Sequence, residues 1–378
     1  MLSRLNLPHG RFVLIVSAML LWSCSDAPVA GPNSTQNIFL ITVDGLRWNE
    51  LFGGADSLLL FSGRGGVKNP AAMAEHYWRS TPTARREALM PFFWQELAPR
   101  GVVYGNRHLG SYAQVANKYR VSAPGYAEIF TGFPQDDVID NSRKQVTHAT
   151  IFEFVRAEWR LSRSQVAAFT SWDLFPYLVS KDPGAIYINA GFAGVEGDKL
   201  TREQLLMNRL QETLPKQWDD VRYDALTFYQ GLEFIKQHQP RLVYFSFGET
   251  DDWAHNGRYD QVLQAATRID GFIEELWRWA QSHRNYRDKT TFIIASDHGR
   301  GSSGSDEWKS HGATIEEADF TWIAVIGPDT PDRGELSNTG TVRQQSIAAT
   351  IAGLLGLDYS KAAPQAAPAL PLAVSADH

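Results

Sequence analysis

Three apolar segments that each lead straight into an acidic turn constrain the fold of this chain more than any other feature. Residues 37–43, 242–247 and 291–295 are largely apolar, and the first of them is rich in β-branched residues. They lead into Asp44-Gly45, Gly248-Glu249-Thr250-Asp251 and Ser296-Asp297-His298-Gly299. Runs of this kind are typical of parallel strands that are buried on both faces. We therefore expect a parallel sheet that presents acids and histidines at the carboxyl ends of its strands.

The segments between and after these strands indicate how the sheet is covered. Residues 259–280 carry apolar side chains at helical spacing, residues 91–100 and 344–355 are further predicted helices, and residues 320–326 form a fourth apolar run. Strands and helices in alternation predict an α/β fold with a doubly wound, mostly parallel sheet and helices on both faces. In such sheets, ligands bind beyond the carboxyl ends of the strands.

Length and composition set the size of the core and exclude one class of partner. The 378 residues, 43% of them hydrophobic, suffice for one large domain, which we place at residues 37–358. Residues 133–240, with their aromatic and charged clusters, are expected to form a cap-like insertion over the active-site edge. The net charge of −6 comes without a long basic run, so no nucleic-acid-binding face is evident. The oligomeric state is unknown from the sequence.

The N-terminal residues have the pattern of a targeting segment. Residues 1–23 combine early basic residues with a short apolar run, as in a signal peptide. The single cysteine, Cys24, follows Leu21-Trp22-Ser23, which resembles the lipobox of bacterial lipoproteins. We therefore expect an exported protein, periplasmic or attached to the outer membrane through a lipid on Cys24. Residues 24–36 would be the tether and 359–378 a loose tail. An ordinary signal peptide with a nearby cleavage site is the alternative.

Six polar side chains stand at or near the predicted strand ends. Carboxylates and imidazoles together are the ligands that borderline divalent ions such as zinc accept. His255 comes four residues after Asp251, so one helical turn would direct both side chains to the same point. Each residue alone also has an ordinary structural explanation, as a helix cap or a surface histidine. The full set is Asp44, Asp251, His255, Asp297, His298 and His311.

The candidate nucleophile is Ser122, in the segment Val-Ser-Ala-Pro-Gly-Tyr-Ala-Glu-Ile-Phe-Thr-Gly at residues 121–132. Pro124 suits the first turn of a helix and Gly132 its end. A hydroxyl at a helix start lies beside unpaired N–H groups and the positive end of the helix dipole, which suits a phosphorylated intermediate. The alternative is that Ser122 serves only as a helix N-cap.

These motifs, in this order, resemble the alkaline phosphatase superfamily, and within it the nucleotide pyrophosphatase/phosphodiesterase-like branch. Val43-Asp44-Gly45 is similar to the first metal-binding acid, and Ser122-Ala123-Pro124 to the nucleophile motif, where threonine is common. Glu249-Thr250-Asp251 with His255, Asp297-His298-Gly299 and His311-Gly312 match the later motifs. The resemblance covers most of residues 37–358.

The resemblance implies two divalent metal ions, most commonly zinc. Asp251, His255 and His311 would bind one ion. The other would be bound by Asp44, Asp297, His298 and the Ser122 oxygen. Asn141 resembles the asparagine that donates to a phosphoryl oxygen in this family. The implied activity is a phosphohydrolase that acts on a small phosphate ester through a phosphoserine intermediate.

Two other functions compete with this one. Sulfatases share the fold, but they require an arginine where this chain has Tyr126. A surface binding lipoprotein that has lost catalysis is the second alternative, although every implied ligand is present. The choice between monoester and diester stays open, because Lys181 or Arg143 would serve a monoesterase and the aromatic residues of 133–240 would serve a diesterase.

Overall fold

The strand β1 (Asn37–Val43) lies near the middle of the main sheet and has a parallel neighbour on each side. The computed structural model describes residues 33–135, 141–197 and 199–372. Within it, β6 (Leu242–Phe247) pairs with one side of β1 and β7 (Thr290–Ala295) with the other. All three strands lie where the sequence predicts them, apart from the one-residue extension of β7. The predicted α/β class and mostly parallel sheet are confirmed.

The full sheet has eight strands in the order β10-β2-β9-β7-β1-β6-β4-β5, and a small second sheet has the order β11-β3-β8. The fourth apolar run, residues 320–326, does not form a single strand. It splits into β8 in the small sheet and β9, which is antiparallel to both β7 and β2. The remaining bounds are β2 Gly101–Tyr104, β3 Ser111–Gln114, β4 Val166–Thr170, β5 Tyr187–Ala190, β8 Phe320–Thr321, β9 Ile323–Ile326, β10 Gly334–Glu335 and β11 Gly340–Arg343.

Both faces of the sheet are buried, which explains why β1 has no polar face. Phe39, Ile41 and Val43 enter one hydrophobic core, and Ile38 and Leu40 enter the other. This alternation is the period of two expected for a strand between two layers.

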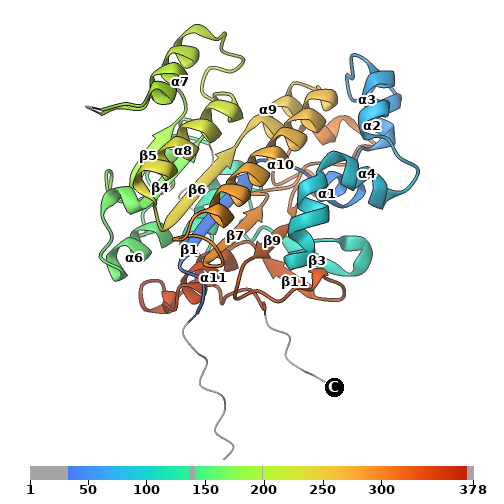
Figure 1. Cartoon of the computed structure of the whole chain (residues 1–378). Helices are drawn as coiled ribbons and strands as arrows, with labels where there is room; N and C mark the ends of the chain where they lie inside the picture. Colours follow the sequence, from blue (N-terminus) through green and yellow to red (C-terminus); the bar gives the residue numbers. More distant parts are fainter. Residues whose placement is uncertain (1–32, 136–140, 198, 373–378) are drawn as a thin grey trace, which may run out of the picture. The chain divides into compact units, whose positions relative to one another are not determined.

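Helices cover the two faces as the predicted architecture requires (Figure 1). Residues of α8 and α10 pack in the core with Phe39, and residues of α5, α6 and α11 pack in the core with Leu40. The predicted helix at 91–100 is present, but most of it is not α-helical: a π-helical segment, Phe93–Leu97, is followed by a 3₁₀ turn, Ala98–Arg100. The α-helices are α1 Trp48–Gly53, α2 Ser57–Phe61, α3 Pro70–Tyr77, α4 Pro82–Leu89, α5 Ser122–Thr131, α6 Ile151–Glu158, α7 Arg202–Thr213, α8 Asp224–His238, α9 Glu249–His255, α10 Tyr259–Ser282 and α11 Ser346–Leu354.

The region predicted as a cap-like insertion, residues 133–240, is largely part of the main domain. It supplies β4 and β5, which extend the sheet beyond β6 in parallel, and α8, which packs on that sheet. In a run as short as Val166–Thr170, the periodicity of apolar residues is the same for a buried strand and a buried helix segment. These strands could therefore not be predicted from the sequence. In this region α7 is the helix that buries little apolar surface.

At each end of the chain, the structure describes only the residues next to the folded domain. The predicted signal peptide, Cys24 and residues 25–32 of the tether lie outside the described residues. Within the rest of the tether, Thr35 is buried and its N–H donates to Asp329. The prediction of a loose tail is wrong for residues 359–372, because buried Leu370 donates its N–H to Thr350 Oγ1 at 2.8 Å. None of the described helices combines the length and apolar character needed to cross a membrane.

Candidate metal centre and nucleophile

Parallel pairing brings the predicted ligands to one edge of the sheet. Asp44 follows β1, Asp251 lies in α9 directly after β6, and Asp297 and His298 follow β7. Since these three strands are adjacent and parallel, their carboxyl ends meet. The structure therefore places together residues that are up to about 250 positions apart in the chain.

Asp44, Asp297 and His298 form the first cluster, with ligand atoms within 4.8 Å of one another. His298 Nε2 lies 3.3 Å from Asp44 Oδ1 and 3.5 Å from Asp297 Oδ2. These two carboxylate oxygens are buried, and neither has a hydrogen-bond partner among the described residues. Buried, unpaired carboxylate oxygens are costly unless a cation compensates them. The cluster therefore fits a divalent metal ion.

The other atoms of this cluster are fixed by the protein. Tyr126 donates its hydroxyl to Asp44 Oδ2 at 2.8 Å, and the Gly45 N–H donates to Asp297 Oδ1 at 3.1 Å. His298 Nδ1 donates to the Gly299 carbonyl at 2.9 Å, so Nε2 faces the two free oxygens. Fixed ligand orientation of this kind strengthens metal binding.

Charge crowding changes the proton affinities in the first cluster. Burial and the nearby Asp44 charge raise the pKa of Asp297 to about 8. Burial alone would lower the pKa of His298, but the Asp297 and Asp44 carboxylates outweigh it and raise that pKa to about 9. The cluster thus holds protons that a bound cation would displace, as metal sites do.

Two glycines allow the close approach of these segments. Gly45 has φ +57°, and a Cβ there would lie 2.5 Å from Asp251 Oδ1 and 3.2 Å from the His298 ring. Gly299 is required by its close contact with neighbouring backbone. A Cβ on it would lie 2.4 Å from the carbonyl oxygens of Glu317 and Phe320. Only glycine fits such contacts.

Ser122 is the first residue of α5, and the N-cap is Val121. No side-chain capping bond is made there, so the alternative role of Ser122 as an N-cap is wrong. Instead the Ser122 Oγ lies 3.1 Å from His298 Nε2, beside the two free carboxylate oxygens. Helix α5 ends at Thr131, and Gly132 follows as its C-cap with φ 85°, as predicted.

Asp251, His255 and His311 form the second cluster. His255 Nε2 lies 3.1 Å from Asp251 Oδ2 and 3.0 Å from His311 Nε2. Burial and the neighbouring His298 lower the pKa of both histidines, which keeps both rings neutral. Among the described residues, Asp251, His298 and His311 have ligand atoms that all lie within 4.8 Å of one another. His255 does not belong to this group.

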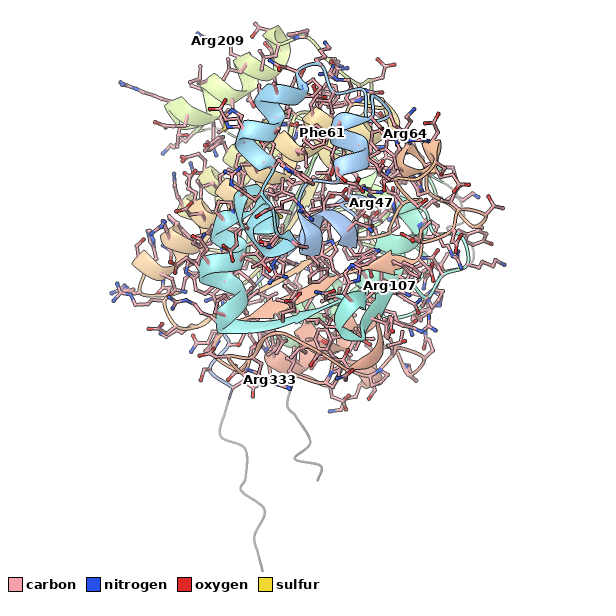
Figure 2. The ribbon with its side chains drawn as sticks, turned by 90° about the vertical axis from the view of Figure 1, so that its right-hand side faces the viewer. Arg47, Phe61, Arg64, Arg107, Arg209 and Arg333 are labelled. Atoms are coloured by element: carbon pink, nitrogen blue, oxygen red, sulfur yellow. The ribbon has the colours of Figure 1, made fainter. Side chains whose placement is uncertain are left out.

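Arg300, which belongs to none of the sequence motifs described above, joins the second cluster. Its guanidinium is buried and contacts the Asp251 carboxylate. Burial lowers its pKa to about 9. The backbone of Gly301, the residue after Arg300, is also fixed. Its carbonyl accepts a hydrogen bond at 3.2 Å from buried Arg47, which is labelled in Figure 2. The position of Arg300 immediately after Asp297-His298-Gly299 was the available signal in the sequence.

A cavity of about 240 Å³ opens in front of the nucleophile. Asn141 lines it, and the Asn141 Oδ1 accepts the Ala123 N–H at 3.1 Å, which places the carboxamide beside Ser122. Its neighbour Asp140 lies outside the described residues. The cavity is lined by Asp44, Ser122, Asn141, Trp172, Asp220, Val221, Gly248, Asp251, Asp252, His255 and His311.

The two basic residues considered for a phosphoryl group lie elsewhere. The Arg143 guanidinium donates to Asp173 at 2.8 Å, and the Lys181 backbone N–H donates to Glu153 at 3.0 Å. Neither residue lines the cavity, and the described residues that do line it include no lysine or arginine. Asp220 and Asp252 are the further charged groups there.

Replacing Tyr126 by phenylalanine is expected to weaken metal binding about 10-fold to 100-fold, because Asp44 loses the hydroxyl that orients it. The chain should keep its fold, at a cost of about 1 kcal/mol in the free energy of unfolding. Zinc titration of the metal-stripped variant measures the effect. Tyr286→Phe is the control, since buried Tyr286 donates to the Pro240 carbonyl away from the site. Equal zinc affinity in both variants would contradict the assigned role of Tyr126.

Comparison with known proteins identifies a family whose sequence pattern this chain matches. Residues 102–326 match the family model described as type I phosphodiesterase / nucleotide pyrophosphatase. A stretch of 148 residues is 25% identical to a probable 2,3-bisphosphoglycerate-independent phosphoglycerate mutase of Leptospira interrogans. That match covers 35% of this chain and 26% of the mutase, so the chain matches about a quarter of that relative's length.

Solved structures show the same fold at low identity. The alkaline phosphatase PafA superposes with a TM-score of 0.55 at 10% identity, over 87% of this chain and 97% of that one. A phosphonate monoester hydrolase from Silicibacter pomeroyi gives a TM-score of 0.52 at 14% identity, over 91% and 78%. At these identities the likeness concerns the fold.

Proposed function

Because the chain belongs to the type I phosphodiesterase / nucleotide pyrophosphatase family within the alkaline phosphatase superfamily, we propose that this hydrolase cleaves phosphate esters with Ser122 as its nucleophile. One observation carries the proposal. The Ser122 hydroxyl and two unpaired carboxylate oxygens, from Asp44 and Asp297, converge on His298 Nε2. A phosphorylatable oxygen at a metal-ligand cluster is the arrangement that this chemistry requires.

Two ligand sets are assigned by the proposal. Asp44, Asp297, His298 and the Ser122 oxygen would hold one divalent ion, and Asp251, His255 and His311 the other. Nitrogen and carboxylate ligands in these numbers favour zinc. When bound, the ions would lower the pKa of the Ser122 hydroxyl and offset charge on the phosphoryl group.

The chain's own residues account for the rest of the reaction. Ser122 Oγ attacks phosphorus, a P–O bond to the serine forms, and the bond to the departing alcohol breaks. The serine proton leaves and the departing alkoxide is protonated, so the alcohol is released. Water then breaks the Ser122–phosphorus bond, which releases a phosphate monoester when the substrate is a diester, whose second substituent stays on phosphorus throughout, and inorganic phosphate when it is a monoester. The Asn141 Oδ1 is already bonded to the Ala123 N–H, so the amide NH₂ group remains to donate to a phosphoryl oxygen. The start of α5 adds its dipole to the same place.

The cavity lining supports a diester rather than a monoester as substrate. A monoester carries a second phosphoryl charge, which needs a cationic side chain. The described lining residues include no lysine or arginine. Asp220 and Asp252, which also line the cavity, are negatively charged or neutral and cannot balance this charge. Trp172 offers an apolar surface to the second substituent of a diester.

The sulfatase alternative is weaker. Tyr126, at the position where a sulfatase requires arginine, is buried and donates to Asp44. It does not line the cavity. Export and attachment through Cys24 remain part of the proposal, since those residues lie outside the described part of the chain.

A substrate panel tests the proposed function. The zinc-loaded protein is assayed on a diester, a monoester and a sulfate that share one aryl leaving group. We expect kcat/KM for the diester to exceed that for the monoester by about tenfold or more, because an unpaired phosphoryl charge is costly. Fastest turnover of the sulfate would favour the sulfatase alternative. A protein that binds no metal and cleaves none of the three would be a binding protein instead.

A further inference from the structure

Arg300 links the loop after β7 to the second ligand cluster. Its guanidinium contacts the carboxylate of Asp251 and the carbonyl of Lys309, and its Nε–H donates to the Trp308 carbonyl at 3.0 Å. The side chain is 2% exposed, so water does not screen its charge from Asp251. One of the three ligands predicted for this metal is thus already paired with a cation.

The same guanidinium also selects the tautomer of His255. Arg300 Nη2 lies 3.3 Å from His255 Nδ1. Arginine has donors and no acceptor, so His255 Nδ1 must accept and the ring proton must sit on Nε2. There it faces two acceptors, Asp251 Oδ2 at 3.1 Å and His311 Nε2 at 3.0 Å. A protonated Nε2 has no lone pair for a metal ion.

The other two histidines are arranged in the opposite way. His298 Nδ1 faces the Gly299 carbonyl at 2.9 Å, and His311 Nδ1 faces the Arg120 carbonyl at 3.3 Å. A carbonyl only accepts, so Nδ1 carries a proton in both rings and Nε2 is the nitrogen that points to the site. Among the three histidines of the site, His255 is the one whose outer nitrogen meets a donor.

The two ligand sets are therefore unequal. Asp44 and Asp297 each direct an unpaired oxygen at His298, whereas Asp251 is paired with Arg300 and His255 has its proton on the ligand nitrogen. We propose that Arg300 competes with a metal ion for Asp251 and His255, so that the two metal sites fill in order. The Asp44–Asp297–His298 site fills first, and the Asp251–His255–His311 site fills when Arg300 gives way. This inference rests on the proposed function, since it concerns the same two sites.

Zinc titration of the metal-stripped protein, in competition with a chromophoric chelator, tests this order. Wild type should take up two zinc ions in steps whose affinities differ by about tenfold or more, because binding the second ion must displace a fixed positive charge. Arg300→Met should tighten the second step by about tenfold or more and leave the first nearly unchanged. Arg222→Met is the matched control: Arg222 is also fully buried, but it donates to Thr227 and Gln230 and contacts no predicted ligand.

The outcomes separate the two proposals. A second step that is unchanged or weaker in a folded Arg300→Met protein overturns the competition, while two bound zinc ions would still support the proposed function. Wild type that binds no zinc at all overturns the proposed function itself.

A readout on wild type covers the case in which Arg300→Met does not fold. Long-range ¹H–¹⁵N spectra of the metal-free protein report the tautomer of each neutral histidine ring. We expect His255 to carry its proton on Nε2 and His311 to carry it on Nδ1. A proton on Nδ1 of His255 would rule out Arg300 as its donor partner and with it the competition.

Discussion

Replacing Ser122 by alanine is expected to reduce hydrolysis by roughly four orders of magnitude or more, as removal of a nucleophile does in other hydrolases. The Ser122 hydroxyl lies at the first cluster, with its Oγ 3.1 Å from His298 Nε2. The variant should retain most of its metal, since Asp44, Asp297 and His298 remain. Initial rates on the aryl diester measure the loss of hydrolysis, and the zinc content of the same sample measures how much metal the variant retains.

Ser180→Ala is the matched control. Ser180 is equally buried, but its hydroxyl donates to the Asp182 carbonyl and does not line the cavity. This variant should hydrolyse the diester at close to the wild-type rate. Undiminished hydrolysis by Ser122→Ala would instead remove Ser122 from the mechanism.

Replacing Asp297 by asparagine is expected to have the second largest effect. Asp297 is fully buried, and its Oδ2 is one of the two unpaired oxygens of the first cluster. The neutral amide cannot supply the charge that holds a divalent ion, so the first site should lose its metal and hydrolysis should fall by roughly a thousandfold. Zinc content and initial rate, measured together, test whether the two losses coincide.

Asp270→Asn serves as the control for burial of a carboxylate. Asp270 is buried, accepts the N–H groups of Phe92 and Phe93, and contacts none of the predicted ligands. Its replacement should lower stability without changing zinc content. Full zinc content in a folded Asp297→Asn protein would contradict the assignment of the first site.

The strands that carry the site were predictable from the sequence because they are buried on both faces. β1 and β6 match their predicted bounds, since an apolar run with no polar face has few other structures open to it. β4 and β5 were missed because each is short and no acid marks its end. The direction of β9 was also missed, because its pairing with β2 and β7 depends on residues far away in the chain.

Some residues of the candidate site could be predicted from the sequence and others could not. Asp44, Asp251, Asp297 and His298 each stand at a strand end, so parallel pairing alone brings them together. The partners that orient them were not predictable by this rule. Tyr126 reaches Asp44 from α5, and Arg300 reaches Asp251 from the loop after β7, through contacts that no local pattern encodes.

The most direct test of the central claim is to look for phosphate on Ser122 during turnover. The zinc-loaded protein is mixed with an excess of the aryl diester and quenched in acid, which preserves phosphate esters of serine, and the digested protein is mapped by mass spectrometry. We expect the peptide that contains Ser122 to carry a phosphoryl group that still bears the second substituent of the diester, and we expect no such group on that peptide in Ser122→Ala. Steady hydrolysis without a phosphoryl group on that peptide, or a phosphoryl group on another residue, would contradict Ser122 as the nucleophile.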